Sequence, residues 1–149
     1  MSTFRFRLAT LQRLREQDRD EKRAHLADAE RAEQIVLDRL AEIDQELDQL
    51  RQKTQQVASP GVVDLDALME VQRYDMLLKF EQAHARQQHQ VVSQEVLKRR
   101  ETLLASDREV KVLELLRDKQ AENHRQEEEK KSNQLIDEVA GRGYLVEKE

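Results

Sequence analysis

The side chains best suited to chemistry in this sequence are its 4 histidines and 31 carboxylates, which can ligate metals or transfer protons. His84 and His89 stand five residues apart, about 140° around a helix, so they do not form the i, i+4 pair of a helical metal site. The carboxylates lie in a strongly charged background, where solvated groups keep ordinary acidities. No glycine-rich phosphate loop occurs. We therefore expect no catalytic residue, no metal site and no cofactor.

The composition indicates long helices rather than a layered globule. Aromatic residues make up 3% of the 149 residues and charged residues 38%, with only three glycines and one proline. Such a charged, apolar-poor chain is also compatible with disorder, although a disordered chain would lack the periodicity described below. A net charge of −5 argues against nucleic acid as the main partner. The absence of cysteine excludes disulfide and thiol chemistry.

The N-terminus carries Arg5 and Arg7 but not the apolar core of a signal peptide, and no apolar run approaches the roughly 18 residues of a membrane span. We expect a cytoplasmic protein.

Two long helices joined at the only proline would position the side chains. In the first, apolar residues follow the 4,3 spacing of a coiled-coil seam, interrupted by Thr54. These residues are Val36, Leu40, Ile43, Leu47, Leu50 and Val57. Pro60 and Gly61 interrupt the pattern, Asp64 suits the N-cap of the second helix, and Gly141 is placed to end it.

The sequence therefore predicts an all-α fold, a long antiparallel two-helix coiled-coil hairpin forming a single domain. The expected parts of domain 1–149 are a helix 4–57, a turn 58–63, a helix 64–140 and a tail 141–149.

A short turn forces antiparallel pairing, with residue i opposite roughly residue 121 minus i. Leu40 then faces Phe80, Leu8 faces Leu113, and Phe4 faces Leu116.

Further along this register, the polar stretch 15–23 falls near the cationic residues 98–100. The second helix has no partner on the first from about Asp118 onward.

Two segments are candidates for binding a partner. The first comprises Phe4, Arg5, Phe6, Arg7, Leu8 and Leu11. Its apolar residues either close the end of the core, or Phe6, on a different helix face from Phe4, inserts into a partner's groove. The second comprises Tyr74, Leu77 and Leu78. Together with Met76 and Phe80 they exceed what one narrow seam can bury, so they form either a broad stripe of the hairpin or a patch for a partner.

Three segments in order resemble the flagellar export protein family FliJ, coiled-coil components of flagellar type III secretion. They are Phe4-Arg5-Phe6-Arg7-Leu8 with Leu11, Leu14-Arg15 and Asp18; Arg100-Glu101 with Leu104 and Lys111-Val112-Leu113-Glu114-Leu115-Leu116-Arg117-Asp118-Lys119; and Gln134-Leu135-Ile136-Asp137-Glu138-Val139-Ala140. The length and the two-helix layout agree with the family. The tail Gly141-Arg142-Gly143-Tyr144 matches nothing in it.

The resemblance implies a non-enzymatic adaptor, similar to the central stalk subunit of rotary ATPases. Its partners would be the flagellar export ATPase hexamer, the export-gate membrane protein and export chaperones, at the cytoplasmic side of the inner membrane. Phe4, Phe6, Leu8 and Leu11 would face the ATPase, and Tyr74 and Leu78 would lie near the gate-contacting surface.

The alternative is an unrelated helical-hairpin chaperone or scaffold of the prefoldin type, and an enzyme is a third class. Solution mass separates the first two, since the FliJ-like protein is expected to be a monomer and the prefoldin-like one a hetero-oligomer.

Overall fold

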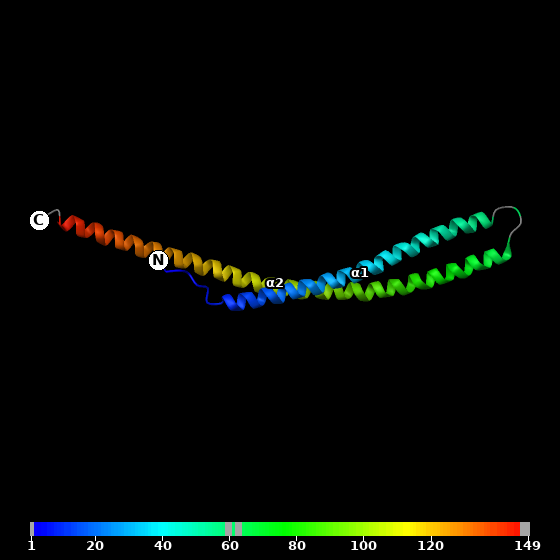
Figure 1. The fold of residues 1–149 in the computed structure, drawn as a ribbon, viewed down its shortest axis with the longest axis horizontal. Helices are drawn as coiled ribbons and strands as arrows, with labels where there is room; N and C mark the ends of the chain where they lie inside the picture. Colours follow the sequence, from blue (N-terminus) through cyan, green and yellow to red (C-terminus); the bar gives the residue numbers. More distant parts are fainter. Residues whose placement is uncertain (1, 59–60, 62–63, 147–149) are drawn as a thin grey trace. The chain divides into compact units, whose positions relative to one another are not determined.

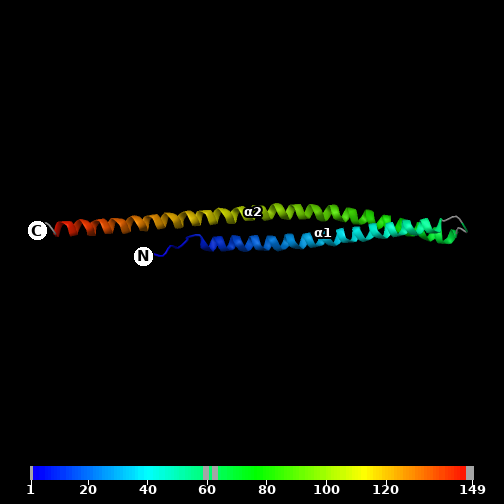
Figure 2. The same cartoon turned by 90° about the horizontal axis from the view of Figure 1, so that it is seen from above.

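The computed structural model describes residues 2–58, 61 and 64–146. Two helices, α1 (Ala9–Val57) and α2 (Leu65–Val146), pack against each other as an antiparallel hairpin that is 93% helical (Figures 1 and 2). No strand occurs within the described residues. The predicted all-α two-helix hairpin is confirmed.

Contacts between the helices divide the chain into two units. The termini-bearing unit combines Met1–Asp20 with Leu104–Glu149, and the loop-end unit is Glu21–Leu103. Each unit contains a part of α1 and a part of α2. The expectation of a single domain stays a prediction.

The core of the loop-end unit is a seam in which both helices repeat every seven residues. Ile43, Leu47 and Leu50 of α1 cluster with Val71 and Leu78 of α2, and all five are buried. This 3,4 spacing is the one that keeps a stripe of side chains facing a partner helix. Burying the stripe stabilises the hairpin by about 25 cal/mol for each Å² of apolar surface removed from water.

Three contacts between the helices agree with the expected register to within three residues. In the loop-end unit, Tyr74 contacts Glu46 and His89 contacts Glu33. In the termini-bearing unit, Ser106 donates to Asp18 over 3.2 Å.

One expected pair is wrong in detail. Leu40 is half-buried, but Phe80 is 73% exposed and takes no place in the seam. Phe80 follows the buried Leu78 by two residues, which turns it about 200° around α2 and away from α1.

The cationic residues of α2 also meet other partners than expected. Arg99 donates to the carbonyl oxygen of His25 and Arg100 pairs with Glu30, rather than with the acidic groups of the stretch 15–23.

The helix ends differ from the prediction in two places. α1 begins at Ala9, not Phe4, because residues 2–6 have no helical hydrogen bonds and residues 7–8 form a turn. α2 continues to Val146 through Gly141 and Gly143, neither of which has a positive φ. Glycine weakens a helix by roughly 1 kcal/mol but does not by itself end it.

The start of α2 is as predicted. The Asp64 carboxylate accepts hydrogen bonds from the backbone N–H groups of Asp66 at 3.1 Å and Ala67 at 3.3 Å, which is the geometry of an N-cap. Pro60 and the tail beyond Val146 lie outside the described residues.

Candidate functional site

The residues considered for chemistry are dispersed. Among the described residues, no group of three or more His, Asp or Glu side chains is placed to hold a metal ion. His84 bonds to Gln88 at 3.3 Å on its own helix, whereas His89 bonds to Glu33 at 3.2 Å across the seam. The two histidines therefore point to different partners, as their spacing predicts.

None of the described helices combines the length and the apolar character needed to span a membrane.

The first candidate surface lies in the termini-bearing unit, where residues 2–8 run along α2 (Figure 1). We call these residues the N-terminal strap. The hydroxyl of Ser2 donates to Oε1 of Glu128 at 2.9 Å and lies 3.0 Å from Nε2 of His124. The Phe4 ring packs against the His124 ring, with centroids 5.8 Å apart and planes tilted by 56°. The strap thus reaches two turns of α2 that α1 does not cover.

The expected contact of Phe4 with Leu116 is therefore wrong. An extended residue advances about 3.3 Å along its path against 1.5 Å in a helix. The non-helical strap consequently carries Phe4 further along α2, as far as His124.

The side chains of the strap alternate in exposure. Phe4, Phe6 and Leu8 are half-buried, whereas Arg5 and Arg7 are exposed. Alternation with a period of two is that of an extended segment with one face covered. The prediction that Phe4 and Phe6 occupy different faces of a helix is wrong for this reason.

Phe6 also lines a shallow hollow of about 300 Å³ at the start of α1. The other lining residues are Ala9, Gln12, Arg13, Glu16 and Arg117. Its lining carries two cations, Arg13 and Arg117, and one carboxylate, Glu16. Leu11, the last predicted residue of this surface, is 38% exposed beside the strap.

The part of α2 beyond the strap is uncovered. Every residue from 129 to 146 is exposed, including Leu135, Ile136 and Val139. Residues at i and i+4 lie on one helix face, so Leu135 and Val139 form a short apolar stripe. The expected overhang of α2 beyond α1 is thus present, and the strap contacts it at His124 and Glu128.

The second candidate surface lies in the loop-end unit and contains two of the three predicted residues. Tyr74 is 44% exposed and Leu77 is 52% exposed, whereas Leu78 is only 2% exposed. Leu78 is part of the buried cluster with Ile43, so it cannot also be a contact for a partner.

Three further exposed apolar residues lie on this surface, and two of them, Met76 and Phe80, belong to the predicted apolar segment. Met69, Met76 and Phe80 are 47%, 71% and 73% exposed. Their spacings of seven and four residues place them on one face of α2 with Leu77. We call Met69, Met76, Leu77 and Phe80 the loop-end apolar face. A heptad repeat counted from Leu78 would have identified the loop-end apolar face, since none of its four residues falls on a seam position.

A chain of polar contacts fastens the helices beside this face. The Tyr74 hydroxyl donates to Glu46 at 2.9 Å, and this hydrogen bond raises the pKa of Tyr74 because it stabilises the neutral phenol. Arg39 donates to Glu81 and to Glu46, and the hydrogen bond to Glu81 is the first cause of its raised pKa.

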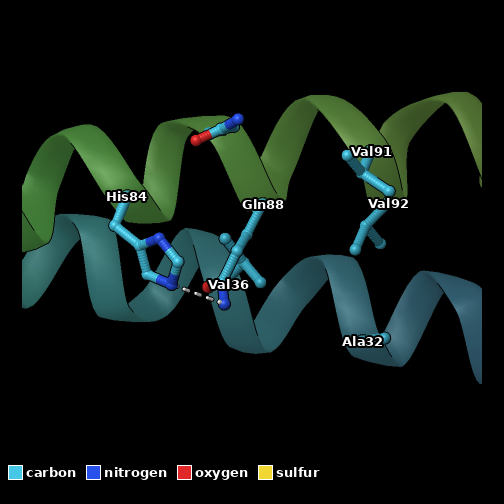
Figure 3. Close-up of a pocket in the computed structure, with 7 residues that line it drawn as sticks. Ala32, Val36, His84, Gln88, Val91 and Val92 are labelled. Atoms are coloured by element: carbon cyan, nitrogen blue, oxygen red, sulfur yellow. Dashed lines mark hydrogen bonds between the residues drawn. The ribbon is translucent and has the colours of Figure 1, made fainter.

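An open groove of about 490 Å³ lies further along the same unit (Figure 3). Ala32 and Val36 form its α1 side, and Val91 and Val92 form part of its α2 side. His84 and Gln88 contact each other above Val36. The groove exists because small side chains occupy this part of the seam, and it contains no arrangement of acid, base or nucleophile.

Comparison with known proteins gives one result. No curated protein and no solved structure shows detectable similarity to the chain. The family model described as "Flagellar FliJ protein" matches residues 4–149, nearly the whole sequence. The match includes residues 4–8 of the strap, both helices and the uncovered part of α2. The chain therefore belongs to the flagellar FliJ family.

Proposed function

We propose that this chain is a non-enzymatic adaptor that joins the flagellar export ATPase to the rest of the export machinery. Membership of the FliJ family makes it a component of the flagellar export apparatus. In the proposal, its termini-bearing unit enters the central opening of the hexameric ATPase and promotes assembly of the ring. Its loop-end unit contacts the export-gate membrane protein and export chaperones, at the cytoplasmic side of the inner membrane.

The proposed ATPase contact is supported by one observation: the termini-bearing unit combines a basic strap with an uncovered part of α2. Arg5 and Arg7 are exposed on the strap, and Arg13 and Arg117 line the hollow beside Phe6. A basic, partly apolar end fits an opening lined by acidic groups, where charge complementarity gives orientation and a high association rate more than raw affinity.

The gate contact is supported by the loop-end apolar face. Four exposed apolar side chains on one helix face exceed what an isolated hairpin needs, since its own seam is already filled by Leu78 and Ile43. Exposed contiguous apolar residues commonly mark protein interaction sites.

The test of the ATPase contact is stimulation of a purified export ATPase by the full chain. Arg5→Ala with Arg7→Ala should abolish stimulation while the helical content stays unchanged, because both side chains are exposed. The matched control is Arg31→Ala with Arg51→Ala, two arginines of the loop-end unit whose side chains are each 75% exposed. Full stimulation by the strap variant would overturn this part of the proposal.

The gate contact is tested by co-purification with the cytoplasmic part of the export gate. Leu77→Ala with Phe80→Ala should abolish co-purification, and Leu104→Ala with Leu115→Ala, two exposed leucines of the other unit, should preserve it. Sedimentation of the isolated chain supplies the contrast with a prefoldin-like scaffold. A monomer fits the adaptor, and an obligate hetero-oligomer fits the scaffold.

A further inference from the structure

The apolar residues of the strap fit both the two-residue repeat of an extended segment and the repeat of a helix. Read as an extended segment, Phe4, Phe6 and Leu8 share one side, and all three are half-buried, with Phe4 packed on His124 of α2. Read as a helix, Phe4, Leu8 and Leu11 are spaced i, i+4, i+7 and share one face, while Phe6 turns away. The same residues therefore suit two different backbone conformations.

The start of α1 at Ala9 has no local stop signal. Residues 1–8 contain no glycine or proline. The residue before the helix is Leu8, which has no side-chain oxygen to cap the free N–H groups, and the first turn holds no acidic residue. The first α-helical bond runs from the Gln12 N–H to the Leu8 carbonyl, and a bond from the Ala9 N–H to the Phe6 carbonyl already closes a tighter turn before it. Local sequence does not explain why the helix begins there.

Contacts with α2 do explain it. Ser2 is anchored to Glu128 and His124, and Phe4 is stacked on His124. A helix through Phe4 would be too short to keep these contacts, because each residue would advance 1.5 Å rather than about 3.3 Å. Docking of the strap and extension of α1 are therefore mutually exclusive.

We propose that residues 2–8 form a two-state strap. In the docked state residues 2–6 are non-helical, residues 7–8 form a turn, and the strap reaches His124 and Glu128 of α2. In the released state residues 4–8 extend α1 by about one and a half turns. Phe4 and Leu8 then continue the α1 stripe, Phe6 leaves its hollow, and the His124 face of α2 is uncovered. Release exchanges the Ser2 and Phe4 contacts for backbone hydrogen bonds of a longer helix.

The strap would thereby control the termini-bearing surface. A partner that binds Phe6, or the face of α2 around His124, would select the released state and extend α1 as it binds. This regulatory step rests on the proposed function, whereas the two-state strap itself does not.

The experiment uses the isolated full chain, with backbone NMR shifts for residues 4–8. The chain has no cysteine, so Thr3→Cys provides a unique site for a nitroxide label that broadens nearby amides. In the otherwise unchanged protein we expect extended-type shifts at 4–6 and broadening at residues 120–128. His124→Ala combined with Glu128→Gln should shift residues 4–8 to helical values and remove the broadening.

Two controls make the result decisive. Glu127→Gln, which changes an exposed carboxylate next to Glu128 on α2, should leave the shifts at 4–8 unchanged. Adding Arg5→Gly to the released variant should lower its helical shifts, because glycine disfavours a helix. The shifts of residues 43–50 report that the hairpin remains folded.

The proposal is overturned if residues 4–8 of the released variant lose the broadening without becoming helical, or if they are already helical in the unmodified chain. Neither outcome involves the ATPase, so failure of the switch is distinguishable from failure of the proposed function. Loss of ATPase stimulation on Arg5→Ala with Arg7→Ala would still support the adaptor.

Discussion

The Tyr74 hydroxyl in α2 donates a 2.9 Å hydrogen bond to the Glu46 carboxylate in α1, so a side chain predicted to face a partner is fastened to its own hairpin. This contact raises the pKa of Tyr74. Glu46→Gln should therefore lower that pKa, because the negative acceptor is replaced by a neutral one. Absorbance titration of the phenol in a Tyr144→Phe background measures it. Asp48→Asn is the control, and an unchanged Tyr74 titration in Glu46→Gln would contradict the assignment.

The raised pKa of Tyr74 also determines how the stability of the hairpin changes with pH. A tyrosine whose pKa is raised by folding stabilises the fold fully below its unfolded pKa, and the contribution is lost as pH rises through the folded value. The Tyr74 contact thus stabilises the hairpin at neutral pH and is lost in alkali.

Two adjacent leucines of α2 should differ sharply when truncated. Leu78 is 2% exposed and Leu77 is 52% exposed. Leu78→Ala should lower the free energy of unfolding by about 2–5 kcal/mol through lost burial and the cavity left behind. Leu77→Ala should change it by no more than about 0.5 kcal/mol. Chemical denaturation followed by circular dichroism measures both, and equal losses would mean that Leu77 is also part of the core.

The hairpin and its register could be predicted from the sequence because they depend on a repeat of seven and a short connection. Ile43, Leu47 and Leu50 are buried as their spacing requires. The expected place of Phe80 in the seam is wrong because it follows from the apolar character of the ring, whereas the position relative to Leu78 decides which way the side chain faces.

The strap could not be predicted because its sequence suits two conformations. The i, i+4, i+7 spacing of Phe4, Leu8 and Leu11 indicates a helix, and only the contacts of Ser2 and Phe4 with His124 and Glu128 favour the extended form. Such contacts link residues 120 or more positions apart, so no local pattern reports them. At the other end of the chain, Gly141 indicates a stop but lies inside α2.

The polar stretch of α1 should exchange its amide hydrogens faster than the seam around Leu47. No α1 residue between Gln12 and Ala29 is fully buried. Its contacts are polar ones such as Arg15 with Glu109 at 3.0 Å, and exposed ion pairs contribute only about 0–1 kcal/mol. Hydrogen exchange read by mass spectrometry should show faster uptake in 15–23 than in 43–50. Equal protection would mean that the polar contacts stabilise this stretch as well as leucine does.

The glycines near the end of α2 should weaken the helix without terminating it. An added Cβ at Gly141 or Gly143 would meet no atom within 4 Å, so alanine fits both positions. Alanine is better than glycine in a helix by about 1 kcal/mol, so Gly141→Ala with Gly143→Ala should slow amide exchange in residues 137–146. The reverse control, Ala140→Gly, should accelerate exchange there, and residues 43–50 should be unaffected by either change. A double variant with unchanged exchange would mean that the last turns are held by something other than helix propensity. Since every residue from 129 to 146 is exposed in the isolated chain, propensity is the main support for these turns, and a partner bound along them should produce the same protection as the two alanines.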